Sequence, residues 1–505
     1  VLFASLSVLA GEIDLDAAEK VSPSSEAGEL VHLLTRLVDK SLVARVPAEQ
    51  DQARYRLLES LRQFGRERLR AAGLEDDLRR RHAEHYLELA ARAEIGIRGP
   101  EQGPLLDRLE ADLDNLRAAL EWGRDKDGMG LSLAVSMWWF WESRGYPSEG
   151  LEWLSEGLDA DSGYDPAVRA KAQAVAASVA LAMGDLEAGT RLARASHEAY
   201  ARLDDPAGLS VATHILGSAA RYASDYAEAT RLLEEARRIA EEIGSAWDVA
   251  WALHHLGQVA GLVGDYTSAQ RHHVRSLALY REAGDELGAG YSLWALGVVA
   301  RYRGEYSLAE ERCEEALRLL RKLRDRSGEA HARYTMGDVA RLQGAYERAG
   351  ALYRDSLEQL RRVGDKRCVA SVLSNLALVS IEKDQLDEAD RFLAESVELR
   401  HEAGDRAGLA ECLERTAEVS HARGEHARAA TLAAAAEAAR ATTASALPNP
   451  EKKRHERLVG SLRASLGPST FSAAWERGAS AGLERALDLA AEGGRLGAAG
   501  VPVRQ

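Results

Sequence analysis

The sequence has few of the residues on which disulfide frameworks, metal clusters and membrane spans depend. Its 505 residues include three cysteines, Cys313, Cys368 and Cys412, which share no close spacing and leave an odd number. Cysteines of this kind are usually small buried residues in a reducing cytosol, so we expect neither a disulfide framework nor a zinc site. No stretch reaches the roughly 18 uninterrupted apolar residues of a membrane helix, and residues 1–10 lack the basic start of a signal peptide. We expect a cytoplasmic location and no membrane segment.

An excess of positive charge is also missing. The 65 Lys and Arg residues are outnumbered by 80 Asp and Glu, which gives a net charge of −15. Proteins that bind nucleic acid concentrate Lys and Arg, so this balance argues against a broad phosphate-neutralising surface. Only 11 prolines and 5 phenylalanines are present, and a composition rich in Ala, Leu, Glu and Arg favours helices.

What is present is a turn-like triplet that recurs every 40 residues without insertion or deletion. Self-similarity at a period of roughly 20–50 residues is the signature of a solenoid, which the size of a single core does not limit. A second turn series lies half a period later, so each repeat is predicted to be two antiparallel helices of about 17–18 residues. The first series begins at Gly184, Ser224, Gly264, Gly304, Gly344, Asp384 and Gly424, and the second contains Asp204, Gly244, Gly284, Arg324, Gly364 and Gly404.

Small residues recur at one position of each helix, where they let neighbouring backbones approach closely. On the first helices they are Gly217, Gly257, Gly297, Gly337, Ala377 and Ala417, and on the second Ala229, Ala269, Ala309, Ala349, Ala389 and Ala429. Together with an apolar stripe on each first helix, this pattern resembles the tetratricopeptide repeat over about residues 165–440. The period is 40 where the common form has about 34. The resemblance implies a mainly α fold, a right-handed α-solenoid of helical hairpins.

The first 75 residues do not follow the repeat. Residues 14–21, 30–42 and 59–71 are predicted as helices, and residues 42–46 and 54–58 as two strands around a polar turn at 47–52. Helices with a two-stranded wing predict a small α/β winged-helix-like segment. Its candidate recognition helix offers only Arg36 and Lys40, beside Asp39, so we favour packing within the protein over DNA contact.

The strongest family resemblance begins in this segment. The stretches LSVLAGEIDLDAAE, LLTRLVDKSLV, RYRLLESLRQFGRERL and LDRLEADLDNLRAAL, and the C-terminal RHERLVGSLRASLGPSTFSAAWERGASAGLERALDLA, are similar to the region after the nucleotide-binding domain of bacterial signal-transduction ATPases of the STAND class. In these NB-ARC/LuxR-associated regulators, a P-loop ATPase core is followed by a winged helix and a tetratricopeptide sensor array. The expected domains are a winged-helix-like segment (1–75, with a start that fits truncation), a helical linker with degenerate first repeats (76–164), the array (165–440), capping helices (441–490) and a disordered tail (491–505).

The motor of that family is missing from the sequence. No Gly-x-x-x-x-Gly-Lys-Ser/Thr motif is present, so the backbone cradle and the lysine for nucleotide phosphates are absent, and the Gly-rich residues 493–497 follow no strand. We expect no enzymatic activity and no cofactor, and we interpret the chain as the regulatory half of such a protein, with its P-loop ATPase domain encoded elsewhere. The first residue is Val and not Met, which fits a fragment or a non-standard start codon.

The first helices of tetratricopeptide arrays line a concave face, where side chains that vary between repeats are candidates for binding. These residues recur at spacings of 3 and 4, which place them on one helix face. Rings and Arg are enriched at interaction hot spots, although the same rings can simply fill a tight superhelix. The later repeats place Ser371, Ser374, Glu411, Glu414 and Glu418 there, an acidic end. The candidate groove residues are His214, Arg221, Trp251, His254, Gln258, Tyr291, Trp294, Arg301, His331, Tyr334, Asp338 and Arg341.

Two other groups of residues are interpreted as structural. The histidine pairs at 254–255 and 272–273 point about 100° apart on a helix, so neither pair can chelate from one face, and we expect no metal site. The aromatic run at 138–141, with Trp153, is favoured as packing at a domain junction over an aromatic ligand cage.

The sequence thus predicts a non-catalytic regulatory or sensor module that binds a protein segment, peptide or small effector in its groove, in bacterial signal transduction or transcriptional regulation. Two alternatives stay open: a stand-alone scaffold for protein assembly, and a DNA-binding regulator acting through the winged helix. The composition argues against a nucleic-acid partner.

Overall fold

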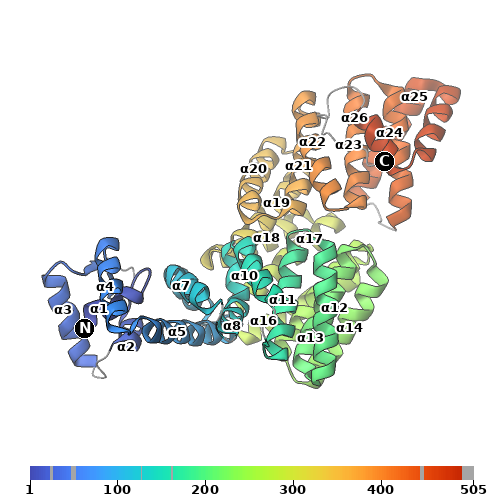
Figure 1. The fold of residues 1–505 in the computed structure, drawn as a ribbon. Coiled ribbons are helices and arrows are strands. Elements are labelled where there is room, and N and C mark those ends of the chain that lie inside the picture. Colours follow the sequence, from blue (N-terminus) through green and yellow to red (C-terminus); the bar gives the residue numbers. More distant parts are fainter. Residues whose placement is uncertain are drawn as a thin grey trace. The chain divides into compact units, whose positions relative to one another are not determined.

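The computed structural model describes residues 1–22, 27–46, 53–124, 126, 128–160, 163–443 and 449–491. Across them the chain is mainly α-helical, with one two-stranded sheet (Figure 1). It divides into two compact units. One consists of residues 1–176 and 198–204, the other of residues 177–197 and 205–505. The sequence-based expectation of a mainly α fold is confirmed.

The winged-helix-like segment opens the first unit. Its helices are α1 (Leu2–Ser5), η1 (Leu6–Val8), α2 (Leu15–Val21), α3 (Ala27–Asp39) and α4 (Glu59–Ala72). The strands β1 (Ala44–Val46) and β2 (Arg54–Arg56) pair antiparallel, as the sequence predicted, while the predicted turn at 47–52 lies outside the described residues. Leu6, Leu9, Ile13 and Leu34 form its buried core. Asp14 caps α2 by accepting the backbone N–H of Ala17.

A buried ion pair joins the wing to the helices that follow. Arg54 on β2 lies 2.9 Å from the carboxylate of Asp112, whose side chain is fully buried and also pairs with Arg108 at 2.5 Å. Removing one member of such a network would leave a buried charge without its counterpart. The helices are α5 (Glu75–Gly96), α6 (Gln102–Ala111), α7 (Leu113–Gly123), α8 (Met129–Ser136), α9 (Trp138–Arg144) and α10 (Pro147–Asp159).

The aromatic run on α9 packs within this unit. Trp141 and Phe140 are fully buried, and the Trp141 indole donates to the carbonyl of Ala134. The rings of Trp138 and Trp139 stack at 4.6 Å, and the Trp138 indole donates to Glu142. These contacts support the packing interpretation over a ligand cage.

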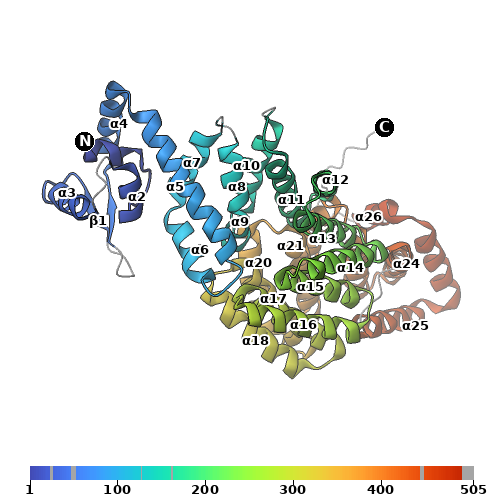
Figure 2. The same cartoon turned by 90° about the horizontal axis from the view of Figure 1, so that it is seen from below.

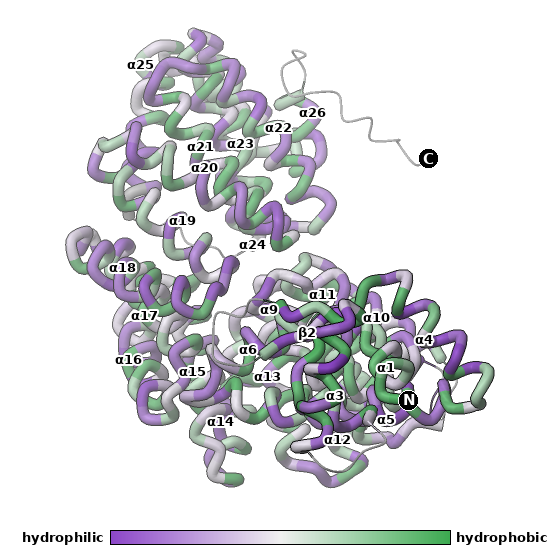
Figure 3. The backbone as a smooth tube through the Cα atoms, turned by 90° about the vertical axis from the view of Figure 1, so that its left-hand side faces the viewer, coloured by the Kyte–Doolittle hydropathy of each residue, from purple (hydrophilic) through white to green (hydrophobic). Residues whose placement is uncertain are grey.

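The repeats consist of helical hairpins that lie side by side (Figures 1 and 2). Most of the helices have 17 or 18 residues, as predicted. Hydrophobic and hydrophilic stretches alternate along them (Figure 3), because one face of each packs on its neighbours. In chain order they are α11 (Pro166–Ala182), α12 (Leu186–Leu203), α13 (Pro206–Tyr222), α14 (Tyr226–Glu242), α15 (Ala246–Leu262), α16 (Tyr266–Ala283), α17 (Glu286–Arg303), α18 (Tyr306–Lys322), α19 (Arg326–Leu342), α20 (Tyr346–Val363), α21 (Lys366–Glu382), α22 (Leu386–Glu402), α23 (Arg406–Ala422) and α24 (His426–Thr443).

Both predicted turn series are confirmed by the backbone. Every position in them has a positive φ, including the non-glycine residues Asp204, Ser224, Arg324 and Asp384, with φ between 52° and 63°. A left-handed residue at each helix end reverses the chain within a few residues, which makes consecutive helices antiparallel.

The small residues mark where the two helices of a repeat touch. A Cβ at Gly257 would lie 2.5 Å from the ring of His273, and one at Gly337 would lie 2.7 Å from the ring of Tyr353. A buried hydrogen bond that recurs with the period also joins second helix to first: Ser276 to Ala250, Ser356 to Ala330 and Ser396 to Ala370, each at 2.8 Å.

First helices of consecutive repeats also touch one another, whereas second helices of consecutive repeats make at most marginal contact. The array therefore curves with its first helices on the inside, and we call the surface formed by the candidate groove residues, with Glu411, Glu414 and Glu418, the inner face. The far end is capped by α25 (Asn449–Ser480), which is kinked at Gly467, and by α26 (Leu483–Ala491). The predicted tail at 491–505 lies almost wholly outside the described residues. Among the described helices, none is both long and apolar enough to cross a bilayer.

We expect Gly337→Ala to lower the free energy of unfolding by about 1–3 kcal/mol, since the added methyl group overpacks the contact with the buried Tyr353 ring. Gly261→Ala is the matched control, because nothing lies within 4 Å of a Cβ there and Ala favours helix over Gly by about 1 kcal/mol. Denaturant unfolding followed by circular dichroism measures both. Equal effects of the two substitutions would contradict the close-packing account.

Candidate functional site

The inner face begins with a cluster of histidines and a tryptophan on α13 and α15. The ring of His214 stacks on Trp251 at 3.6 Å, and His255 meets it edge-on at 4.5 Å. His214 is buried, and neither of its ring nitrogens has a hydrogen-bond partner within the described part of the chain. Burial lowers the pKa of His214 well below its usual value, so the ring is neutral at pH 7.

A second histidine pair joins the two helices of the same repeat. His254 lies 5.3 Å from His273, ring to ring, and the side-chain amide of Gln258 lies 3.0 Å from its Nε2. Burial lowers the pKa of His254 to about 4. These rings pack as neutral groups between helices, and His255 and His272 are not drawn into a ligand set with them.

The next repeat contributes rings that are anchored by hydrogen bonds. The Trp294 indole donates to the hydroxyl of Thr335 at 2.9 Å, and the Tyr291 hydroxyl lies 3.4 Å from the carboxylate of Asp325. His331 lies 5.0 Å from the Trp294 ring. Each of these contacts crosses from one first helix to the next or to the cap of the next, so these candidate groove residues hold the repeats together.

A buried polar network surrounds Asp338. Its carboxylate pairs with Arg301 at 2.8 Å, accepts the hydroxyl of Tyr353 at 2.6 Å and accepts the amide of Asn375 at 2.7 Å. The same amide also donates to the hydroxyl of Tyr334 at 3.0 Å. Arg301 is therefore neutralised within the array and is not available as an anion-binding group.

The other two inward arginines differ from each other. Arg341 pairs with Glu451 at 3.2 Å, from the capping helix α25. Arg221 stacks on the ring of Tyr222 at 4.1 Å, and Arg367 approaches the same ring at 4.5 Å. Within the described residues Arg221 has no carboxylate partner, so of the three inward arginines only this one keeps an uncompensated charge.

The predicted acidic end of the groove is not an open acidic surface, which corrects that expectation. Glu411 pairs with Arg400 at 3.1 Å, Glu414 with Arg440 at 2.5 Å, and Glu418 with Arg415 at 3.3 Å. Glu411 also accepts the hydroxyl of Ser374. Although burial opposes it, Arg400 and Arg415 hold the pKa of Glu411 below its usual value. The arginines that neutralise these carboxylates come from second helices or from the same helix, where inspection of the inner-face positions alone does not find them.

The first turns of α25 lie on this end of the inner face. Besides the Glu451–Arg341 pair, Arg454 pairs with Glu418 at 2.5 Å and with Glu382 at 2.7 Å, and His455 lies 2.8 Å from Glu414. The hydrogen bond to Glu414 raises the pKa of His455, so burial is more than offset. The sequence gave no periodic signal for this contact, because α25 follows the last repeat and its partners lie 36–110 residues back.

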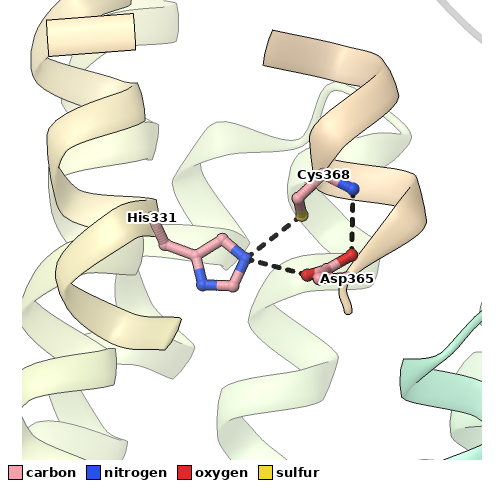
Figure 4. Close-up of side chains that lie close together, drawn as sticks. All are labelled: His331, Asp365 and Cys368. Atoms are coloured by element: carbon pink, nitrogen blue, oxygen red, sulfur yellow. Dashed lines mark hydrogen bonds and ion pairs between the residues drawn. The ribbon is translucent and has the colours of Figure 1, made fainter. Parts of the chain in front are cut away.

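A compact group of three side chains lies further along the face (Figure 4). His331 Nε2 is 3.1 Å from the Sγ of Cys368 and 3.5 Å from Oδ2 of Asp365. Asp365 is the N-cap of α21, and its Oδ1 accepts the backbone N–H of Cys368 at 2.9 Å. Burial opposes it, but the hydrogen bond from His331 lowers the pKa of Asp365. Of these three residues, sequence reasoning selected only His331.

Comparison with known families assigns both parts of the chain. A model described as a tetratricopeptide repeat matches residues 209–282, 248–322, 289–362 and 328–400, and one described as a winged helix-turn-helix domain matches residues 1–70. The chain carries a winged helix-turn-helix domain and tetratricopeptide repeats. The resemblance read from the sequence is confirmed in these two parts.

Curated relatives have a related description. A protein of Mycobacterium tuberculosis (strain H37Rv) and one of Mycobacterium bovis are each 34% identical over 221 residues, and both names class them provisionally as HTH-type transcriptional regulators. The matched part is 41% of this chain and 25% of each relative, so this chain spans about a quarter of the length of the curated relatives it matches. The winged helix-turn-helix domain, the repeats and these names point to protein interaction or transcriptional regulation.

Solved structures of low identity share the helical-repeat architecture. A STAND protein with a tetratricopeptide-repeat sensor from Pyrococcus horikoshii has a TM-score of 0.42 and 16% identity, covering 76% of this chain and 59% of that one. A Rap protein in complex with competence and sporulation factor has a TM-score of 0.47 and 13% identity, covering 65% of this chain and 99% of that one. At these values neither likeness says anything of a ligand of this chain.

The buried histidines predict an acid-sensitive array. Because the pKa values of His214, His254 and His273 are lowered in the folded state, the unfolded chain binds more protons below about pH 6.5, and stability falls as the pH drops toward 4. Each histidine contributes a slope of up to about 1.4 kcal/mol per pH unit in that window. Replacing His254 with Gln is therefore expected to reduce the loss of unfolding free energy between pH 6.5 and 5 by about 1–2 kcal/mol.

Denaturant unfolding at several pH values measures this effect. The exposed His32 supplies the control, since His32→Gln should leave the pH profile unchanged. If His254→Gln has the same pH profile as the unsubstituted chain, the neutral packing of this histidine is refuted.

Proposed function

We propose that this chain is a non-catalytic regulatory module whose inner face binds a polar helical segment of a partner protein. The observation that carries the proposal is the position of the first turns of α25, a helical segment, on this face. Glu451, Arg454 and His455 are spaced i, i+3 and i+4, so they lie on one side of the helix. Each meets a group of complementary charge on a first helix.

The inner face selects for charge order along the segment. Arg341 on α19 takes a carboxylate, while Glu418 and Glu414 on α23 take basic groups that follow it by about one helical turn. The inner-face partners are largely buried, so an empty site would leave charges without counterions, at a cost of several kcal/mol. A partner segment that carries an acidic residue one turn before a basic pair would satisfy the same groups. Such a segment would therefore compete with the first turns of α25.

The first turns of α25 differ from the rest of the helix in what holds them. Leu458 and Leu462 are buried in the core formed with α24, whereas Lys453 and Arg457 are exposed, and the contacts of 451–455 are ion pairs. The turn can therefore leave the face without opening that core. Binding would shift the chain between a self-occupied and a partner-occupied state, and in a longer regulator this shift would alter packing against a P-loop ATPase domain.

A DNA-binding function is less well supported by the winged helix-turn-helix domain of this chain. Its arginines are largely engaged with their own protein: Arg54 with Asp112, Arg56 with Glu12, and Arg62 with Glu59. Arg36 on α3 is exposed, but Asp39 is exposed on the same helix. A stand-alone scaffold would use the inner face in the same way without displacement of α25.

A fluorescent peptide with the sequence of residues 449–466 tests the proposal in trans against the full chain. Arg454→Ala combined with His455→Ala should free the inner face while Leu458 and Leu462 keep the cap folded. We expect this variant to bind the peptide at least about tenfold more tightly than the unsubstituted chain, a difference of about 1.4 kcal/mol, because the competing segment is weakened. Fluorescence anisotropy gives the dissociation constants.

Lys453→Ala is the matched control, since Lys453 is exposed on the same turn and should not change binding. Adding Glu418→Lys to the double variant should abolish the gain. If the folded double variant binds the peptide no better than the Lys453→Ala control, the inner face is a packing surface and the proposal fails.

A further inference from the structure

The group of His331, Asp365 and Cys368 has the dimensions of a metal-binding site. Tetrahedral zinc with bonds of about 2.0–2.3 Å places its N, O and S ligand atoms about 3.3–3.6 Å apart. Here Nε2 lies 3.1 Å from Sγ and 3.5 Å from Oδ2, and the three ligand atoms all lie within 4.8 Å of one another. Figure 4 shows the three side chains converging from two neighbouring first helices.

The carboxylate of Asp365 is fixed in place and still has a free ligand atom. Its Oδ1 caps α21 by accepting the N–H of Cys368, and Oδ2 faces the histidine. A hydrogen bond of this kind orients a ligating carboxylate. His331 and Asp365 retain 14% and 18% of their side-chain exposure, so an ion can reach the group from solvent.

Neighbouring repeats show which part of this arrangement is structural. At the equivalent junctions the N-cap aspartate also caps with Oδ1 and faces a side chain of the preceding repeat with Oδ2: Asp285 accepts from Trp247, and Asp325 from Tyr291. A donor to the cap is therefore a general feature, and the His331–Asp365 contact alone does not require a ligand.

Cys368 is what the general feature does not explain. The same position is glycine in four other repeats, Gly208, Gly288, Gly328 and Gly408. A Cβ at Gly288 would lie 2.5 Å from the ring of Tyr280, and one at Gly328 would lie 2.7 Å from Leu320. Among these junctions, a thiol stands at this position only where the preceding repeat offers a histidine.

We propose that His331, Asp365 and Cys368 bind a divalent transition-metal ion of the zinc class. One imidazole, one carboxylate and one thiolate form a borderline-soft set that suits zinc and does not suit magnesium or calcium. A carboxylate and a thiolate supply two negative charges, which match the charge of the ion. Three protein ligands leave a fourth position open to water or to a group of a bound partner.

The ion would join α19 to the start of α21 and so fix the angle between two consecutive repeats. This site departs from the expectation of no metal, which considered histidines adjacent in sequence; these ligands are separated by 34 and 37 residues, close to one repeat. Metal binding and segment binding on the inner face are separate claims, since none of the three ligands pairs with the first turns of α25.

The test uses the full chain with Zn²⁺ or Co²⁺ alone as the probe. His331→Tyr combined with Cys368→Gly copies the neighbouring junction of Tyr291, Asp325 and Gly328, so it removes two ligands while keeping a donor to the helix cap. We expect the unsubstituted chain to bind about one Zn²⁺ in competition with a chromophoric chelator, and to show a thiolate-to-cobalt charge-transfer band with Co²⁺. The double variant should bind at least about 100-fold more weakly, since even loss of a residue that merely supports a ligand costs about 10–100-fold.

A thermal melt with and without Zn²⁺ provides the second readout. An ion bound by the folded chain raises the melting temperature, and the double variant should melt cooperatively without that rise. Cys313→Ser controls for thiols outside the site and should keep both the band and the stoichiometry. Absence of stoichiometric binding by the unsubstituted chain, or equal binding by the folded double variant, would overturn the proposal.

Discussion

The close approach of the two helices in each repeat is the constraint on which the rest of the array depends. Glycine or alanine at one position of every first helix lets a side chain of the second helix lie against its backbone, as His273 does at Gly257 and Tyr353 at Gly337. Turns with one left-handed residue keep the length of each hairpin constant, so the same approach recurs every 40 residues. Because this frame is fixed, side chains of neighbouring first helices always meet at the same offsets.

Those offsets explain why the inner face consists of linked pairs and not of isolated groove residues. Contacts between consecutive first helices recur at separations of 37 and 41 residues: His331 with Cys368, Asp338 with Asn375, and Trp294 with Thr335. Most charges on the face are thus neutralised by the array or by α25, which makes the face demanding about the charge order of any segment that replaces α25.

Much of the fold could be predicted from the sequence, because period, turn residues and small residues are local signals. The helix lengths, the left-handed turns, the winged-helix elements and the close contacts all followed from them. The candidate site was predicted only as a surface. Its pairings depend on which residues face one another across repeats, and the ion pairs of Glu411, Glu414 and Glu418 depend on helices outside the inner face. The 37-residue offset is nevertheless readable in the sequence, and applied to His331 it identifies Cys368. The return of α25 follows no period and could not be predicted in this way.

The central claim is that the first turns of α25 occupy a surface made to bind such segments and can leave it. Hydrogen–deuterium exchange of the full chain, with and without a saturating peptide of residues 449–466, measures this directly at the amides of residues 453–457. The account predicts that these amides exchange faster than those of residues 458–466, that the peptide accelerates them further, and that it protects first helices α19, α21 and α23. Exchange at 453–457 that is as slow as in the rest of the helix and unchanged by the peptide would contradict it.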